Sequence, residues 1–273
     1  MSTSAPLTAA DLQPRAGSRM YWAVADAAVL AKRHLIQIPR IPEMLVFATV
    51  QPVMFVILFR YVFGGSIVVG DVSYVNYLMA GIFVQTVAFG SVATGIGLAD
   101  DLTKGLIDRF RSLPMSRSAM LTGRTVADLV RNMFVVFVML VVGLLVGFRP
   151  EAGLTGWLGG LGLLLLLSFA FSWVGASVGL LVRSVEAAQS GGFIWLFPLT
   201  FASSAFVDPE NMSGWLRGFA QNQPFTIIVD AVRSFFLDEP VGSDGWLALA
   251  WLVGLIVVFA PVSVRLYEKR TAH

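Results

Sequence analysis

The chain contains several apolar segments that approach or exceed the roughly 20 residues that a helix needs to cross a bilayer. Hydrophobic residues make up 56% of its 273 residues and charged residues only 13%, against about 25% charged residues in soluble domains. The segments are continuously apolar, whereas the strands of a membrane β-barrel alternate apolar and polar residues. The sequence therefore predicts an all-α polytopic membrane protein.

The apolar segments and the residues between them divide the chain. We expect six spans, over about 43–64, 74–99, 125–147, 155–182, 187–207 and 245–265, within one transmembrane domain over 42–270. Residues 1–18 are expected to be a flexible cytoplasmic tail. In 19–41, Arg19, Asp26 and Arg33 fall on one face of an otherwise apolar helix, which predicts an interfacial amphipathic helix. Residues 208–244 mix helical and apolar patterns, which predicts short external re-entrant helices.

The positive charges lie mainly on one side of the expected membrane. The tail and interfacial helix hold five Lys or Arg, the linker after the second span holds five, or six with Arg131, and three follow the last span. The other side holds Arg149, Arg217 and Arg233 beside eight acidic residues. Because cytoplasmic loops are enriched in Lys and Arg, both termini are expected to face the cytoplasm.

Two motifs in the spans suggest packing more than chemistry. GxxxG pairs occur at Gly143/Gly147, Gly156/Gly160 and Gly175/Gly179, a spacing that lets helix backbones approach closely. The last pair also frames a G-x-S-x-G pattern around Ser177, the nucleophile elbow of serine hydrolases. That chemistry needs a base, and the two histidines, His34 and His273, are far from this span in the sequence. No catalytic residue is therefore expected.

Other function classes are disfavoured by what the chain lacks. It has no cysteine and only two histidines, so no metal site of those ligands is expected. It contains no G-x-x-x-x-G-K-[ST] loop, so we expect neither nucleotide nor any other cofactor to bind this chain itself. Ionisable residues are nearly absent from the middle of the spans, which argues against a proton- or ion-coupled carrier.

The linker over about 104–124 combines basic and apolar residues. Phe110, Leu113 and Met115 interrupt the charges, and Arg109 and Arg111 flank Phe110. A short helix with an apolar knob and a basic rim suits a groove on a partner protein. The alternative is a charged connector that only sets topology; we favour docking.

Aromatic and amide side chains recur in three of the spans. Such a surface suits an amphipathic or lipid-like cargo held by apolar contacts and a few hydrogen bonds, although lipid-facing aromatics and helix packing are the alternative for each residue. The candidate cargo residues are Gln51, Phe55, Phe59, Gln85, Phe89, Phe193, Phe197 and Phe201.

Three stretches together resemble a known family. They are RIPEMLVFATVQPVMFVILFRYVFGGSI (40–67), GLIDRFRSLPMSRSAMLTGR (105–124) and FPLTFASSAFVDPENMSGWLRGFAQNQPFTIIVDAVR (197–233). In this order and spacing they resemble the permease subunits of ABC-2 type transporters, in particular the daunorubicin-resistance permease group. The resemblance extends over most of residues 40–235.

The resemblance implies an exporter of hydrophobic drugs, lipids or glycolipids in a bacterial plasma membrane. It implies a dimer of this permease with a second copy or a related permease, surrounded by membrane lipids and without nucleic acid. Two copies of a separate cytoplasmic ATPase would bind ATP and Mg²⁺ and drive alternating access of the spans. The implied ATPase-coupling residues are Asp108, Arg109, Phe110, Arg111, Ser112, Leu113, Pro114 and Met115.

Two other functions stay open at this point. One is a membrane component of the same family that acts in immunity or sensing without exporting anything. The other is an intramembrane enzyme acting on lipids, for which the spans offer no base or metal ligand.

Overall fold

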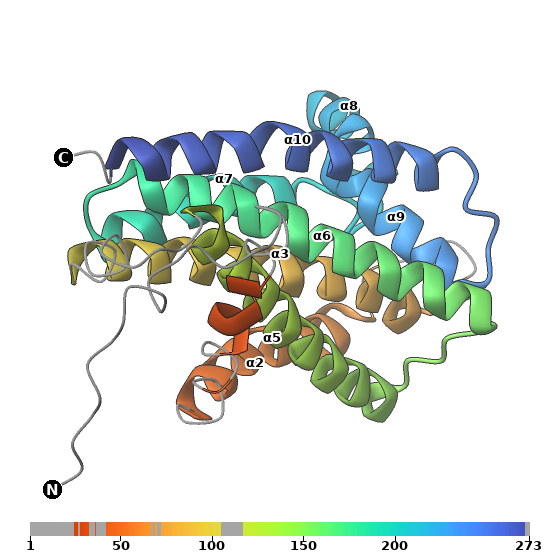
Figure 1. Ribbon diagram of the computed structural model, residues 1–273. Coiled ribbons are helices and arrows are strands. Elements are labelled where there is room, and N and C mark those ends of the chain that lie inside the picture. Colours follow the sequence, from red (N-terminus) through yellow and green to blue (C-terminus); the bar gives the residue numbers. More distant parts are fainter. Residues whose placement is uncertain are drawn as a thin grey trace, which may run out of the picture.

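A computed structural model describes residues 25–26, 28–32, 36, 42–65, 67, 69, 72–104 and 117–270. The secondary structure of these residues is helical (Figure 1), so the expectation of an all-α membrane protein is confirmed. The expected coupling residues 108–115 and the tail over 1–18 lie outside the described residues. Of the expected interfacial helix, residues 25–26, 28–32 and 36 are described, and they are helical.

The helices follow one another with short connections. They are α2 (Pro42–Ile57), η2 (Leu58–Phe63), α3 (Tyr74–Thr103), α5 (Arg117–Val146), α6 (Leu154–Leu181), α7 (Val185–Phe201), η3 (Pro209–Asn211), α8 (Gly214–Asn222), α9 (Pro224–Leu237) and α10 (Asp244–Arg270). Serine caps begin two of them: the Ser73 and Ser184 hydroxyls accept hydrogen bonds from the backbone N–H groups of Asn76 and Ala187.

Five helices in the described part of the chain are long and apolar enough to cross a membrane. They are Leu45–Phe63, Tyr74–Thr103, Leu121–Val146, Leu154–Leu181 and Asp244–Arg270. The helix in the place of the fifth expected span, α7, has 17 residues, which is at the lower limit of a spanning length. The structure thus supports a multi-pass protein but does not confirm the count of six.

The helix α3 forms the centre of the bundle, and α6 crosses it with backbone contact. An added Cβ atom at Gly175 would lie 2.1 Å from the Ser91 carbonyl oxygen, and one at Gly179 would lie 2.3 Å from that of Gly95. The helices can approach this closely because glycine has no side chain at the crossing. The packing role predicted for the Gly175/Gly179 pair is confirmed.

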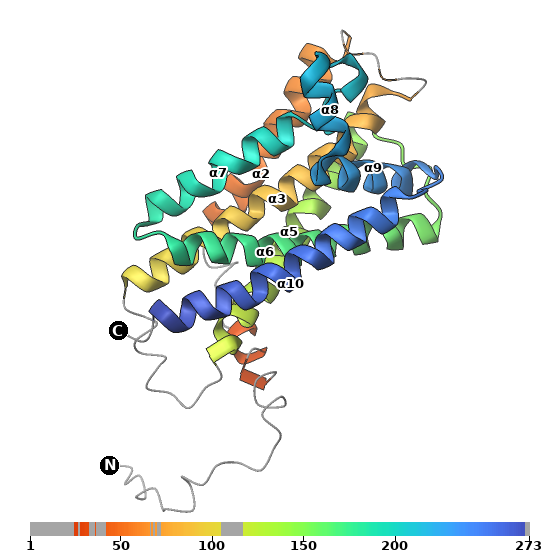
Figure 2. The same cartoon turned by 90° about the horizontal axis from the view of Figure 1, so that it is seen from above.

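The two ends of the bundle differ. At one end, here called the linker end, α3 and α10 finish and α5 begins; Leu30 of the N-terminal helical residues packs there with Leu98, Leu121 and Tyr267. At the other end lie η3, α8 and α9 (Figure 2). Of the two helices in the segment expected to be re-entrant, α9 is mostly buried against the bundle, whereas α8 is largely exposed.

Helix ends differ from the expected span limits in two ways. The helices α3 and α5 continue past the apolar segments, to Thr103 and from Arg117, so a shorter connection remains between them than the expected 104–124 linker. In contrast, α7 ends at Phe201, and turns replace the helix that was expected to continue to residue 207.

Candidate functional site

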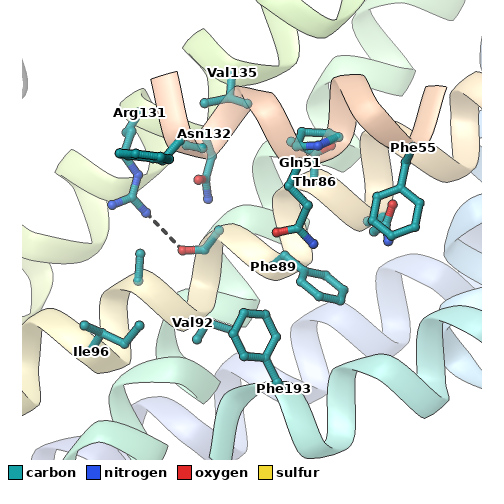
Figure 3. A pocket seen from close by; sticks show the side chains of 16 residues that line it. Gln51, Phe55, Thr86, Phe89, Val92, Ile96, Arg131, Asn132, Val135 and Phe193 are labelled. Atoms are coloured by element: carbon teal, nitrogen blue, oxygen red, sulfur yellow. Dashed lines mark hydrogen bonds between the residues drawn. The ribbon is translucent and has the colours of Figure 1, made fainter. Parts of the chain in front are cut away.

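A cavity of about 320 Å³ lies halfway along the bundle, between α2, α3, α5 and α7. Figure 3 shows Phe89 and Phe193 on one side of it, Arg131, Asn132 and Val135 on another, and Gln51 and Phe55 from α2. The cavity occupies the middle of each helix that lines it. It therefore lies at membrane depth, where apolar or amphipathic molecules can bind.

Five of the eight candidate cargo residues line this cavity: Gln51, Phe55, Gln85, Phe89 and Phe193. The structure brings together three spans that the sequence could only describe separately. The other three candidates, Phe59, Phe197 and Phe201, do not line the cavity. They extend its aromatic wall toward the α8–α9 end.

The aromatic wall is continuous from one helix to the next. Phe89 of α3 contacts Phe193 and Phe197 of α7, with ring centroids 5.7 Å and 5.2 Å apart. Phe55 lies 5.9 Å from Phe201 by the same measure. Aromatic rings at these separations attract one another in stacked or edge-on arrangements.

One member of the wall was missed by sequence reasoning. The Phe206 ring stacks on Phe59 at 4.5 Å and lies 5.1 Å from Phe201. It follows α7 in a short turn segment whose direction the sequence pattern did not indicate. Phe206 closes the aromatic cluster between α2 and α7 near the α8–α9 end.

Two neighbouring polar side chains of α3 face the cavity without partners. Gln85 is 3% exposed, and neither atom of its amide has a hydrogen-bond partner among the described residues. The Thr86 hydroxyl likewise has none within the described part of the chain. A buried polar group without a partner costs about 1–3 kcal/mol, so these two groups are held at a cost to stability.

A buried ion pair borders the cavity on α5, which sequence reasoning also missed. The Arg131 guanidinium lies 3.0 Å from the Asp128 carboxylate and donates to the Gly90 carbonyl oxygen at 2.9 Å (Figure 3). The Thr94 hydroxyl donates to the same carboxylate at 2.6 Å. From the sequence, Arg131 is expected inside the span over 125–147 and is counted with the linker charges only as an alternative. Its burial beside the cavity assigns it to the span, and the expectation that the middle of the spans is nearly free of ionisable groups is wrong at this pair. The signal was the i, i+3 pair inside an apolar segment.

The same face of α5 is joined to α3 and α6 at several heights. The Asn132 amide donates to the Ser168 hydroxyl of α6 at 2.9 Å. Nearer the linker end, Arg124 forms an ion pair with Asp101 of α3. The helices α3 and α5 flank the undescribed residues 105–116. An ion pair and hydrogen bonds thus join these two helices from the linker end up to the cavity.

The end of α3 carries a second ion pair. Lys104 lies 2.7 Å from Asp100, and this hydrogen bond raises the pKa of Lys104. Both side chains are well exposed, so the pair adds little stability.

The α8–α9 end is closed by a cluster around Arg233. Its guanidinium lies 3.6 Å from the centre of the Tyr77 ring and donates to the Ser204 carbonyl oxygen at 2.7 Å. It also forms an ion pair with Asp230, whose carboxylate accepts from the Ser204 hydroxyl at 2.7 Å. These contacts join α9, α3 and the turn after α7 beyond the aromatic wall.

The Ser177 hydroxyl, which the G-x-S-x-G pattern singled out, lies inside α6 and bonds the Ser263 hydroxyl of α10 at 2.7 Å. Ser263 in turn donates to the Trp173 carbonyl oxygen at 3.1 Å. Ser177 is therefore part of a helix–helix contact. Among the described residues, no group of three or more His, Cys, Asp or Glu could hold a metal ion.

Comparisons with known proteins place these features in a family. Residues 26–237 match the ABC-2 type transporter family. The chain is 33% identical over 260 residues to the daunorubicin resistance ABC transporter permease protein DrrB1 of Streptomyces coeruleorubidus, covering 94% of this chain and 92% of that protein.

More distant relatives cover most of the chain as well. The probable doxorubicin resistance ABC transporter permease protein DrrC of Mycobacterium tuberculosis is 27% identical over 234 residues, or 83% of this chain and 82% of that protein. The putative transport permease ycf38 of Cyanophora paradoxa is 25% identical over 222 residues, or 79% of this chain and 76% of that protein. With a family match over most of its length and a cavity at membrane depth, the chain belongs to the ABC-2 type transporter family, among permeases of the daunorubicin-resistance type.

Proposed function

We propose that the chain is the membrane permease of an ATP-driven exporter and that its cargo passes through the cavity between α2, α3, α5 and α7. The observation that carries this proposal is the cavity itself, which combines an aromatic wall with a few polar groups halfway along the bundle. Lining of this kind is typical of sites for apolar or amphipathic small molecules. Hydrophobic drugs, lipids and glycolipids all fit this description, and the relatives' names point to drug resistance.

The energy comes, in this proposal, from a separate ATPase that binds ATP and Mg²⁺. The chain contains no phosphate-binding loop of its own. Two copies of the ATPase would dock on a dimer of permeases. Each ATPase would bind the segment from Asp108 to Met115 of one permease. This segment joins α3 to α5, the two helices whose mutual ion pair and hydrogen bonds reach the cavity.

This arrangement suggests how force reaches the cargo. A push on the coupling segment moves the fastened pair α3 and α5 as one body, because charged and polar contacts hold them together along their length. The helix α2 is largely exposed along its apolar face. Its contacts with α3 and with α5 are sparser than those between α3 and α5, so it can shift relative to that pair. Relative motion of these cavity walls would expose the cavity alternately to the two sides of the membrane.

The proposal is tested by reversing charge at Arg109 and Arg111 together. We expect Arg109→Glu with Arg111→Glu to abolish co-purification of the ATPase and to reduce export at least tenfold, because acidic side chains no longer match the partner's groove. Export is measured in bacterial cells that express the permease together with its ATPase, with daunorubicin as the first cargo.

A matched control reverses two charges elsewhere at the linker end. Arg265 and Lys269 are exposed on α10, so Arg265→Glu with Lys269→Glu should leave co-purification intact. Full export and full co-purification in the Arg109/Arg111 variant would contradict docking at this segment. Loss in both double variants would indicate a general charge effect and would also contradict it.

A further inference from the structure

The polar pair Gln85 and Thr86 is the part of the cavity that packing does not explain. Both residues lie on α3, both line the cavity, and the Gln85 side chain is almost fully buried. The described residues leave both Gln85 amide atoms and the Thr86 hydroxyl unbonded. Near the cavity, Asn132 is bonded to Ser168 and Thr94 to Asp128. Trp195 and Thr200 of α7 also lack partners among the described residues, but they do not line the cavity.

An unbonded amide in an apolar cavity points to a ligand that completes its hydrogen bonds. A leucine or methionine at position 85 would fill the same space without the cost of a buried polar group. The amide offers a donor and an acceptor side by side. The neighbouring Thr86 hydroxyl can serve as either, so a carbonyl or a hydroxyl on the ligand finds a partner.

The charges around the cavity argue against an ionised group on the part of the ligand that enters it. Arg131 is the charged residue among the described cavity-lining residues. Its positive charge is compensated by Asp128 at 3.0 Å, and one of its N–H groups is taken by the Gly90 carbonyl oxygen. An anion entering the cavity would have to compete with Asp128, and a cation would meet no uncompensated carboxylate there. Burying either charge is costly.

We propose that this cavity recognises an uncharged carbonyl or hydroxyl group on an aromatic or aliphatic body, and that Gln85 is the residue that determines this specificity. The inference rests on the proposed function, because it takes the cavity as the cargo site. Beyond the proposed function, it states which chemical group of the cargo lies in the cavity. The body of the cargo lies against Phe55, Phe89 and Phe193, and its neutral polar group reaches Gln85.

Three fluorescent probes of nearly equal shape test this. They are 2-acetylanthracene, which carries a ketone, 2-ethylanthracene, which carries no hydrogen-bonding group, and anthracene-2-carboxylate, which is charged. Binding to the purified full chain in lipid nanodiscs is measured by fluorescence, with empty nanodiscs subtracted. We expect the ketone to bind about five- to tenfold more tightly than the ethyl compound, as one hydrogen bond provides. The carboxylate should bind at least tenfold more weakly than the ketone.

The variant Gln85→Met keeps the length of the side chain and removes its hydrogen bonds. It should reduce the preference for the ketone over the ethyl probe to within about twofold. Gln221, which is exposed on α8, gives the matched control: Gln221→Met should keep the full preference. Equal binding of ketone and ethyl probes by the natural chain, or tightest binding of the carboxylate, would overturn the proposal.

Stability provides a second readout that needs no ligand. If Gln85 is kept for a ligand, Gln85→Met should melt at the same temperature as the natural chain or higher. A clearly lower melting temperature would show that Gln85 already has a structural partner and would overturn the inference. The binding measurement uses no ATPase. Loss of export in the Arg109/Arg111 variant with probe preference intact would support both proposals. If that variant loses export but the natural chain shows no probe preference, only this inference is removed.

Discussion

At the scale of single residues, the ion pair on α5 has the largest expected effect on stability. The Asp128 and Arg131 side chains are each 10% exposed, and a second partner, Thr94, holds the carboxylate. A buried pair contributes little compared with an apolar pair of the same shape, but removing one partner leaves an isolated charge in a medium that solvates it poorly. The pair is thus a point where one substitution can unfold the protein.

We expect Asp128→Asn to lower the free energy of unfolding by about 3 kcal/mol or more, because Arg131 then stays buried without a counter-charge. Asp100→Asn is the matched control. Its partner Lys104 is 62% exposed and Asp100 itself 39% exposed, so losing that pair should cost less than about 1 kcal/mol. Thermal unfolding of both variants in one detergent compares them. Similar small effects would mean that Arg131 finds another partner when Asp128 is neutralised.

Some residues of the candidate site were predicted from the sequence, and others were not. The amide residues of the spans were recognisable because such side chains are unusual at membrane depth, and Gln51 and Gln85 line one cavity with three of the aromatic candidates. Asp128 and Arg131 were overlooked because both lie near the start of the expected span 125–147, where charged side chains usually reach the membrane interface. Hydropathy cannot show that α5 begins at Arg117 and carries both residues inward.

At the scale of helices, the crossing of α3 and α6 depends on glycine on both sides. An added Cβ atom at Gly175 would lie 2.1 Å from a backbone oxygen of α3, and backbone cannot turn aside as a side chain can. We therefore expect Gly175→Ala to destabilise the protein by about 1–3 kcal/mol, as overpacked cores do.

Another glycine of the same helix provides the control for this prediction. A Cβ atom at Gly162 meets nothing within 4 Å, so Gly162→Ala should be neutral or slightly stabilising, since alanine favours helix more than glycine does. Thermal unfolding in detergent measures both. Equal stability of the two variants would mean that α6 can move away from α3 without loss.

The ends of the helices are a second feature that the sequence predicted only in part. The apolar segments were predicted well because crossing a membrane requires continuous apolar residues. The end of α7 at Phe201 was not, because residues 202–207 are small or apolar and give no breaking signal. The turn is held instead by Ser204, whose backbone N–H donates to the Thr226 hydroxyl and whose hydroxyl donates to the Asp230 carboxylate, both on α9. Such contacts between distant segments exist only in the folded chain.

At the scale of the whole molecule, polar contacts and aromatic rings succeed one another from the linker end of the bundle to the α8–α9 end. The ion pair of Asp101 with Arg124 lies near the linker end, and the Asp128–Arg131 pair lies beside the cavity. The aromatic wall continues to Phe206, and the Arg233 cluster closes the far end. In the proposed exporter, a push at the linker would act on one end of this path and the cargo would leave at the other.

This direction of transport requires the linker end to face the cytoplasm, which single-cysteine labelling tests. The chain contains no cysteine, so in the chain purified after labelling the introduced thiol is the only one that can carry the label. Gln221 on α8 and Lys269 at the end of α10 are both exposed and lie at opposite ends of the bundle. In intact cells a membrane-impermeant maleimide should label Gln221→Cys and leave Lys269→Cys unlabelled until the membrane is permeabilised. That result follows from the excess of Lys and Arg at the linker end. The reverse pattern would place the coupling segment outside the cell, where no ATP-driven partner could act on it, and the proposed exporter would have to be abandoned.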